Sequence, residues 1–436
     1  YVCSLLFFLI IIKLLFVLHR AQEQNIRNLE QSFIAKGSYS LARHLIQQRE
    51  YFFADQVDLN RPMPLNDLKR EKEVLIRVIS NKAPDYLRCK VYTRYLQGQW
   101  KDREETAELA LVIEESIGAL ASIKYRLQEP QEEANEKFDI FFTNKFHSDK
   151  LPVTAAFNEV EIVAESLGID KDGQVSSNKW KKDAGYTVFN EKDSKRQTFN
   201  LPTDIEDEKY LQVPEDIKEN LVKLLDEIKD FAEDDNDFNK MQAIALHLQN
   251  NYVYRLGPYK VEPELEFPRK RQRFAAMRKA LSQRMHRKDI AYRPALLDSY
   301  EEPLLHFLEE SKAGHCELFA SSAVLLLRQA GIPARYVSGF ICNELHPSKA
   351  YYVARLGHAH AWLEAYDKES KNWLMLDPTP ADGRRDYQNA WSYKEAVLDK
   401  IKMLVTQILA SIQRGLIAEA IWNALKLAWQ LIYNPI

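Results

Sequence analysis

The chain has 436 residues, of which 46% are apolar and 28% charged, and its formal net charge is −3. These values are typical of a globular protein of two or three domains, and they exclude a disordered chain and a protein that depends on strong positive charge to bind nucleic acid. Four cysteines are too few for a disulfide scaffold, and the absence of a CxxC pair argues against structural zinc.

The first eighteen residues, "YVCSLLFFLIIIKLLFVL", carry one charge, at Lys13. Their length matches the hydrocarbon thickness of a bilayer, so residues 1–20 are predicted to form a transmembrane helix. A signal peptide and a buried helix are the alternatives, although the small-residue pattern of a cleavage site is weak. Because the chain begins with Tyr1 rather than Met, we expect a fragment whose further membrane helices lie upstream. Residues 21–62 are predicted to be a helical linker, which ends at the prolines of "RPMPLND".

Residues 63–203 alternate between apolar and polar side chains in several stretches, which is the two-residue period of strands. We therefore expect a β-rich domain here, with a helical insert near 103–128. The predicted strands fall within 73–80, 85–100, 139–146, 155–164, 185–190 and 196–201.

Residues 204–388 begin with an acidic helical stretch (204–235) and a second helix that ends near Asn251. Strand-like segments follow at 350–355, 360–366 and 372–378. Helices followed by antiparallel strands predict an α+β domain.

The stretch "GHCELFASSAVLLLRQAGIPARYVSGF" (314–340) sets Cys316 immediately before an apolar helix that ends at Gly331 and Pro333. A helix that is apolar on nearly every face is expected in a domain centre. The unpaired amides and the positive dipole end at its N-terminus stabilise a thiolate, which is the form of cysteine that attacks carbonyl carbons. The sequence therefore offers Cys316 as a nucleophile.

A base for that nucleophile is available on the later strands. If Tyr366 and Trp373 flank the turn "DKESK", then His360 and Asp377 lie diagonally on one face of a hairpin, within reach of each other. A carboxylate beside an imidazole fixes its tautomer and stabilises its charged form. We therefore predict a triad of Cys316, His360 and Asp377.

Structural readings of the same residues remain open. A single cysteine before an apolar helix is more often a core residue, and an Asp in "DPT" is often a turn residue. His358 shares a strand face with His360, so periodicity cannot separate the two as the base. A zinc site of Cys316, His358 and His360 is a further alternative that lacks a fourth ligand. Neither a cofactor nor a metal is expected.

The segments "GHCELFASSAVLLLRQAGIPARYVSGF", "HAHAWLEAY" and "LDPTP" together resemble the transglutaminase-like superfamily, and the resemblance spans roughly 205–385. It implies a papain-like α+β core over 204–388, in which Cys316 is the nucleophile, His360 the base and Asp377 its partner. On this resemblance His360 is favoured over His358.

Weaker likenesses, such as "YLRCKVYTRYLQGQW" (86–100), resemble the bacterial membrane-anchored branch of that superfamily. In that branch a β-rich segment precedes the core, and the core lies outside the cytoplasmic membrane. The resemblance implies that residues 21 onward lie on the periplasmic or extracytoplasmic side. That branch often has an aromatic residue where this chain has His315, which would either stabilise the thiolate or cap the helix.

The activity implied by the resemblance is thiol acyl transfer on a carboxamide or amide group of a protein or peptide. The acyl group then passes to an amine or to water. A cysteine peptidase or amidase of the cell envelope and a catalytically inactive envelope scaffold are the alternatives. Tyr252, Tyr254 and Tyr300 are candidates for a second oxyanion donor, and nothing in the sequence selects one of them.

The segment 269–288, "RKRQRFAAMRKALSQRMHRK", has nine Lys or Arg in twenty residues and apolar residues at helical spacing. It is predicted to be a basic amphipathic helix that lies on anionic lipid or covers the site, with a solvated, docked helix as the alternative. Nucleic acid is disfavoured because aromatic residues do not alternate with the basic ones. Residues 389–436 are predicted to be amphipathic helices that pack on the protein or lie at the bilayer surface.

Overall fold

The structure is a computed structural model that describes residues 56–60, 71–101, 112–117, 120–126, 136–143, 150–164, 166–178, 185–190, 197–198, 208–228, 236–256, 302–383 and 391–413, with the single residues 146, 148, 421 and 425. All of them belong to the compact unit Asp55–Ile436. The transmembrane helix predicted over 1–20 and the basic helix predicted over 269–288 lie outside the described residues and stay predictions. None of the helices in the described ranges is long and apolar enough to cross a membrane.

A six-stranded antiparallel sheet, here called the core sheet, lies at the centre of this unit. Side chains alternate between the two faces of this sheet along β3, β18 and β21, so that one face is apolar and the other is partly charged. The strands in order are β10 (Val153–Thr154), β3 (Asp85–Tyr92), β18 (Ala334–Cys342), β21 (Ala359–Asp367), β22 (Asn372–Leu376) and β15 (Gln197–Thr198).

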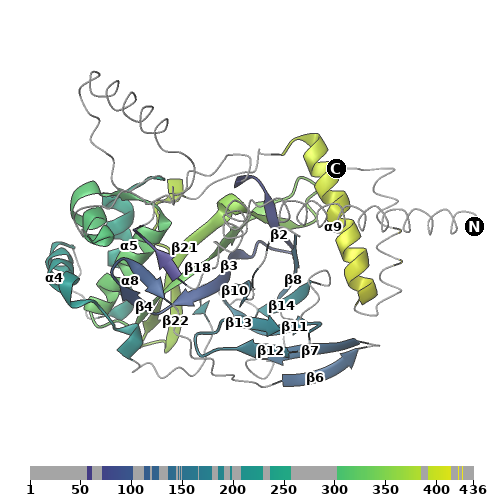
Figure 1. The fold of residues 1–436 in the computed structure, drawn as a ribbon, viewed down its shortest axis with the longest axis horizontal. Helices are drawn as coiled ribbons and strands as arrows, with labels where there is room; N and C mark the ends of the chain where they lie inside the picture. The colour runs from purple at the N-terminus through teal and green to yellow at the C-terminus, as the bar shows by residue number, and fades with distance from the viewer. Residues whose placement is uncertain are drawn as a thin grey trace, which may run out of the picture. The chain divides into compact units, whose positions relative to one another are not determined.

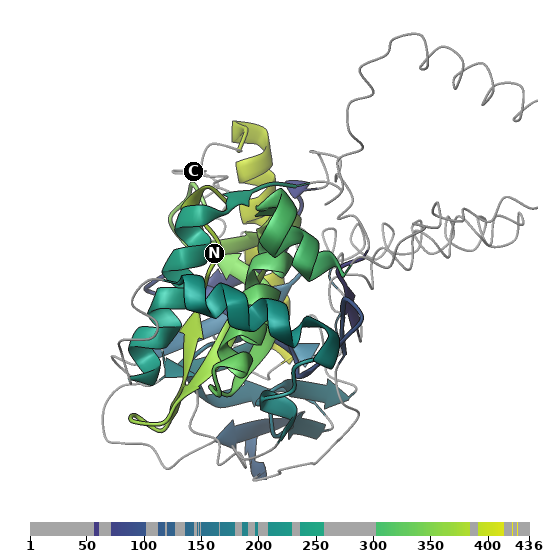
Figure 2. The ribbon, with the colours of Figure 1, turned by 90° about the vertical axis from the view of Figure 1, so that its left-hand side faces the viewer.

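Three helices cover the apolar face of the core sheet: α4 (Lys218–Glu227), α5 (Asp237–Asn251) and α8 (Cys316–Gln329). Figures 1 and 2 show them gathered on one side of β18 and β21. The helix α8 is buried along almost its whole length, and it is terminated two residues after its last turn by Gly331, whose φ of +78° is the left-handed conformation that glycine adopts without strain. The predicted central helix and its end are confirmed.

A second, eight-stranded sheet draws strands from both predicted domains. The strand order is β19 (Glu344–Leu345), β20 (Tyr352–Arg355), β2 (Val74–Ile79), β8 (Glu136–Phe142), β14 (Tyr186–Asn190), β11 (Phe157–Ile162), β7 (Leu120–Arg126) and β6 (Val112–Ile117). Conversely, β3 from the predicted β-rich domain pairs with β18 in the core sheet. The boundary expected near residue 203 is therefore crossed by both sheets, because pairing between distant strands is invisible in local composition.

Two of the sequence predictions are corrected. Residues 112–117 and 120–126 form a β-hairpin, not the helix expected near 103–128, since the β-branched residues of this stretch pair across β6, β7 and β11. Residues Gln56–Asp58, at the end of the predicted helical linker, form strand β1, which pairs with β5 (Gln99–Lys101) next to β4 (Arg94–Leu96). Pairing with β5 and burial of Leu59 outweigh the local helical preference.

The remaining elements are short. A three-stranded sheet joins β12 (Ser166–Ile169), β13 (Val175–Asn178) and β9 (Lys150–Leu151), and a parallel pair joins β16 (Val253–Tyr254) and β17 (Ala313–Gly314). The helix α7 (Pro303–Leu305) continues into a π-helical turn, His306–Ser311. Further 3₁₀ turns lie at Glu208–Tyr210, Glu215–Ile217, Leu356–His358 and Ala381–Gly383.

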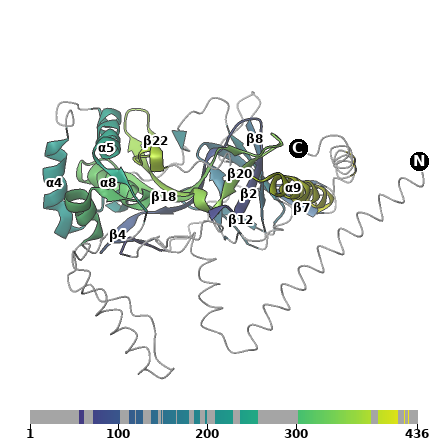
Figure 3. The same ribbon diagram turned by 90° about the horizontal axis from the view of Figure 1, so that it is seen from above.

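The C-terminal helix α9 (Tyr393–Gln413) packs against the eight-stranded sheet, at the opposite end from α4, α5 and α8 (Figure 3). Its residues Met403 and Ala410 join a cluster with Phe141 and Val353. Asp399 forms a buried bidentate pair with Arg77 at 2.5 and 3.0 Å. Residues 393–413 of the tail therefore pack on the protein, which is one of the two arrangements predicted for residues 389–436; the other is a position at the bilayer surface.

Candidate active site

Cys316 is the first residue of α8 and is only 2% exposed. The short strand β17 ends two residues before it, at Gly314. A glycine is needed at this position because a Cβ would lie 2.7 Å from Leu318 Cδ1 and 2.9 Å from the Phe307 ring. The residue before the helix, His315, has extended backbone angles, and its carbonyl accepts from the amides of Leu318 and Phe319. The earliest amides of the helix have no partner within the helix. The thiol therefore lies at the positive end of a buried helix dipole.

His360 and Asp377 come together across the hairpin of β21 and β22. The predicted register is confirmed, because Tyr366 pairs with Trp373 and the ladder runs to Leu363 opposite Leu376. His360 Nε2 lies 2.9 Å from Asp377 Oδ2, and the two side chains are 3% and 5% exposed. A carboxylate this close, out of water, favours the charged imidazolium.

Cys316 completes this group. Burial disfavours the charged form of His360, but the charge and hydrogen bond of Asp377, together with a hydrogen bond to Cys316, outweigh it and raise the pKa of His360 to about 10. Since Nε2 faces Asp377, the other ring nitrogen, Nδ1, is left for the thiol. The three predicted site residues are thus brought together, although the first lies on α8 and the other two on the core sheet.

Three further bonds hold Asp377. Its Oδ1 accepts from the Thr379 amide at 3.0 Å, and its backbone carbonyl accepts from Gln249 Nε2 at 2.8 Å. Its Oδ2 accepts from the Tyr86 hydroxyl at 2.7 Å. Asp377 therefore also stabilises the turn of "DPT", through the bond from the Thr379 amide. That bond uses only Oδ1, so Oδ2 remains available to His360 and Tyr86.

His358, the other candidate base, is engaged elsewhere. It lies in the 3₁₀ turn before β21, where its Nδ1 accepts from the Arg355 amide at 3.2 Å. Its Nε2 lies 3.6 Å from Glu344 Oε2. The geometry separates two histidines that periodicity could not, and only His360 has the carboxylate and the thiol as partners.

His315 takes neither of the roles expected for it. Its side chain makes no capping hydrogen bond, and burial lowers its pKa to about 4, so it is neutral at physiological pH and brings no positive charge to the thiol. Within the described part of the chain its Nδ1 has no hydrogen-bond partner, and the nearest carboxylate oxygen, of Glu317, is 3.8 Å away. It acts as a packing residue behind the helix start.

Of the three tyrosines proposed as oxyanion donors, Tyr252 donates its hydroxyl to the Leu308 carbonyl at 3.0 Å, which removes it from that role. Tyr254, on β16, pairs with Gly314 on β17, and Gly314 lies two residues before Cys316. The ring of Tyr254 lies against Gly383. Tyr300 lies outside the described residues. Tyr254 is therefore the one of these candidates that the described structure brings near the thiol segment.

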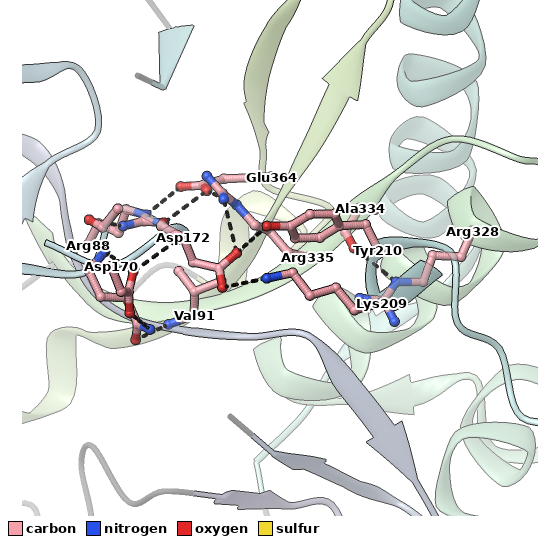
Figure 4. Close-up of polar contacts among 12 residues, drawn as sticks. Arg88, Val91, Asp170, Asp172, Lys209, Tyr210, Arg328, Ala334, Arg335 and Glu364 are labelled. Carbon is pink, nitrogen blue, oxygen red and sulfur yellow. Dashed lines mark hydrogen bonds and ion pairs between the residues drawn. The ribbon is translucent and has the colours of Figure 1, made fainter. Parts of the chain in front are cut away.

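Sequence reasoning missed a buried charge network on the polar face of the core sheet (Figure 4). Glu364, four residues after His360 on β21, accepts from Arg88 Nε at 2.8 Å and from Arg335 Nε at 2.6 Å. Arg335 also reaches Asp172, whose Oδ1 accepts from the Tyr210 hydroxyl at 2.6 Å. No local signal predicts these partners, because the bonds join five separate segments of the chain.

Each carboxylate of this network is paired with a guanidinium group, so these groups remain ionised although they are buried. Burial raises the pKa of Glu364, but the charges of Arg88 and Arg335 outweigh it and hold the pKa below its usual range. The same holds for Asp172, whose pKa is lowered by Arg335 and Lys209 against the effect of burial. The network joins β21 to β3 and β18 at a position four residues along β21 from His360.

Among the described residues, no group of three His, Cys, Asp or Glu side chains is arranged to hold a metal ion. With His358 bound to Arg355 and Glu344, the zinc alternative of Cys316, His358 and His360 finds no support in the geometry.

The chain was compared with known protein families, curated proteins and solved structures. Residues 271–378 match the family model described as the transglutaminase-like superfamily, a shorter range than the 205–385 expected, but one that contains Cys316, His360 and Asp377. A protein named protein-glutamine gamma-glutamyltransferase, from Pseudomonas aeruginosa, is 36% identical over 100 residues, which are 23% of this chain and 15% of that protein.

An uncharacterized protein, YebA of Bacillus subtilis, is 28% identical over 192 residues, 43% of this chain and 20% of that protein. The alignments thus span a fifth or less of the length of these two relatives. The crystal structure of the periplasmic domain of TgpA from Pseudomonas aeruginosa superposes with a TM-score of 0.49 at 18% identity, over 77% of this chain and 96% of that one. The segment 271–378, which carries Cys316, His360 and Asp377, thus matches the transglutaminase-like superfamily.

Proposed function

We propose that this chain is a cysteine acyl-transfer enzyme in which Cys316 is the nucleophile, His360 the general base and acid, and Asp377 the residue that orients His360. The observation that carries the proposal is the contact of a single imidazole with both groups: Nε2 lies 2.9 Å from the Asp377 carboxylate, and the ring also bonds to the thiol of Cys316. A nucleophile, a base within hydrogen-bond reach and a third group that orients the base form the arrangement required for covalent catalysis.

The first half of the reaction follows from these positions. His360 accepts the thiol proton, and Cys316 Sγ bonds to the carbonyl carbon of a carboxamide or peptide bond. The carbonyl oxygen takes up the negative charge, and amides at the start of α8 are placed to donate to it. When the carbonyl re-forms, the C–N bond breaks, and His360 returns its proton to the departing ammonia or amine.

The first half leaves the acyl group bound to Cys316 as a thioester, and the second half of the reaction cleaves this thioester. A primary amine that attacks the acyl carbon gives a new amide and restores the thiol, whereas water gives a carboxylic acid. The name of the Pseudomonas aeruginosa relative, a protein-glutamine gamma-glutamyltransferase, supports an amine as the acceptor and a glutamine carboxamide as the donor. Hydrolysis, as in a cysteine peptidase or amidase, would use the same three residues. It is the alternative outcome, and the acceptor assay described below distinguishes the two.

We further propose that the site lies outside the cytoplasm on a chain anchored by the apolar segment 1–20, with a protein or peptide as substrate. That apolar segment supports the anchor. The basic segment 269–288 is proposed as a second contact with anionic lipid.

The first experiment is alkylation of the full-length chain, in detergent, by iodoacetamide across a range of pH, read by mass spectrometry for each cysteine. Ordinary thiols ionise near about pH 8.5, and we expect Cys316 to react well below that pH and to lose this reactivity in His360→Ala. Cys89 and Cys342 are internal controls, because burial raises the pKa of each. If Cys316 reacts no faster than these two, the proposal fails and the inactive scaffold stands.

The acyl acceptor is then tested with a glutamine-containing peptide, with and without a fluorescent primary amine. Incorporation of the amine with release of ammonia supports transglutamination, and conversion of glutamine to glutamate supports hydrolysis. Cys316→Ala is the matched blank and should abolish both. Either product retained in Cys316→Ala would contradict the role of the thiol.

A further inference from the structure

Tyr86 binds the carboxylate that orients His360, and it does so from a strand far outside the segment that matches the family model. Its hydroxyl donates to Asp377 Oδ2 at 2.7 Å, and the same oxygen faces His360 Nε2 at 2.9 Å. Tyr86 lies on β3, 291 residues before Asp377 in the chain. One carboxylate oxygen is therefore shared between the proposed base and a tyrosine from the β-rich segment.

The ring of Tyr86 is held in place for this contact. It packs edge-on against Trp362 with ring centroids 5.1 Å apart, and it lies 6.2 Å from the His360 ring. Trp362, on β21, is itself completely buried in a cluster with Val91 of β3 and Val337 of β18. A tyrosine whose ring is fixed by two aromatic neighbours has little freedom to aim its hydroxyl elsewhere.

A β-bulge turns Tyr86 toward the site. On β18, Ser338 pairs with Lys90 but the next residue, Gly339, pairs with Arg88, so Cys89 is an extra residue in β3. Without it, alternation would send Tyr86 and Arg88 to the face covered by α8. With it, both lie on the face of His360 and Glu364, where Tyr86 reaches Asp377 and Arg88 reaches Glu364.

Gly339 makes the bulge sterically feasible. A Cβ on this residue would lie 2.0 Å from the Leu87 carbonyl oxygen and 2.7 Å from the Trp362 ring. Gly339 also pairs with His360 across β18 and β21. The close approach of β3 to β18 at this point, and therefore the position of Tyr86, requires a residue without a side chain.

We propose that Tyr86 is a positioning residue of the site, acting on His360 through Asp377; this rests on the proposed function. The donated hydrogen bond draws negative charge toward the hydroxyl, so Asp377 stabilises the imidazolium less strongly than a carboxylate bound to His360 alone. Tyr86 thereby tunes the basicity of His360. Through Tyr86, the β-rich segment contributes a side chain to the active site.

The test is Tyr86→Phe in the full-length chain, which removes the hydroxyl and keeps the ring. A more basic His360 stabilises the thiolate, so the pH of half-maximal alkylation of Cys316 by iodoacetamide should fall, by about half a unit or more. The matched control is Tyr351→Phe, which removes a hydroxyl that donates to another buried carboxylate, Asp399 Oδ2, at 2.8 Å. That control should leave the alkylation curve unchanged.

A curve for Tyr86→Phe that coincides with that of the wild type, or that moves to higher pH, overturns the inference. Loss of thermal stability without a shift of the curve does the same, because it would assign Tyr86 a structural role alone. The proposed function is judged separately by the wild-type chain. If the wild-type Cys316 shows no reactivity that depends on His360, the function fails before Tyr86 is considered.

Discussion

The carboxylate of Asp377 lies 2.9 Å from Nε2 of His360, and both side chains are withdrawn from water. Because the pair is buried, the charge of Asp377 is weakly screened, and it raises the pKa of His360 to about 10 even though burial acts in the opposite direction. An imidazole this basic takes a proton from a neighbouring thiol readily. The contact therefore links the fold of one hairpin to the reactivity of Cys316 on a different element.

Replacement of Asp377 by Asn should remove the charge and keep the shape. His360 then loses the stabilisation of its charged form, so the thiolate of Cys316 should form only at higher pH, and kcat/KM should fall by about 10³–10⁴-fold. The measurement is the alkylation curve together with steady-state kinetics on a glutaminyl peptide.

The control for this substitution is Asp367→Asn at the end of β21, where the carboxylate accepts from the amides of Glu369 and Ser370. It removes a carboxylate that holds a turn and should leave both quantities close to those of the wild type. Equal losses in the two variants would show that the effect of Asp377→Asn is not specific to His360.

Folding stability should fall with rising pH because of His360. Its pKa is about 10 in the folded chain against 6.5 for an ordinary histidine, so between these values the folded chain holds a proton that the unfolded chain has released. The contribution is complete below about pH 6.5 and is lost as pH rises toward 10. Urea unfolding midpoints measured across this window should decline in the wild type and decline less steeply in His360→Gln. Parallel curves would contradict the raised pKa.

The sequence predicts the three proposed site residues because their signals are local. Cys316 precedes an apolar helix of recognisable length, and His360 and Asp377 follow from strand period and a short turn whose register the structure confirms. The same reasoning cannot separate His358 from His360, since both have the same period. Their separation depends on Glu344 and Arg355, which bind the first and not the second.

The domain boundary and Tyr86 are beyond such reasoning. The alternation in "DYLRCKVY" predicts strand β3, but not that its neighbour is β18, nearly 250 residues later in the chain. A bulge reverses the face of every residue on one side of it, so even a correct strand prediction assigns Tyr86 and Arg88 to the wrong side of the sheet. The predicted helix near 103–128 is wrong for a related reason: pairing of β7 with β11 decides the conformation there.

Glu364 should be important for stability because two guanidinium groups depend on it. Its side chain is fully buried between Arg88 and Arg335. Glu364→Gln removes the carboxylate that Arg88 and Arg335 share. Arg335 keeps Asp172 as an acidic partner, but Arg88 is left with backbone carbonyls and a neutral amide, so we expect a loss of about 3–5 kcal/mol in the free energy of unfolding. Chemical denaturation is the measurement, and Glu219→Gln on the exposed face of α4 is the control, with an expected change within about 0.5 kcal/mol. Similar small losses in both variants would contradict a network that depends on Glu364.

Two glycines allow the role of the bulge to be tested by the same substitution. Gly331 has a φ of +78° and open space around it, so Gly331→Ala should cost about 1–2 kcal/mol from backbone strain alone. Gly339→Ala introduces a methyl group 2.0 Å from the Leu87 carbonyl oxygen, and we expect a loss of about 3 kcal/mol or more. Because relief of that contact must move β3, only Gly339→Ala should also shift the alkylation curve of Cys316, in the direction predicted for Tyr86→Phe. A curve that is unchanged in Gly339→Ala, despite the loss of stability, would show that the bulge is not what brings Tyr86 to Asp377.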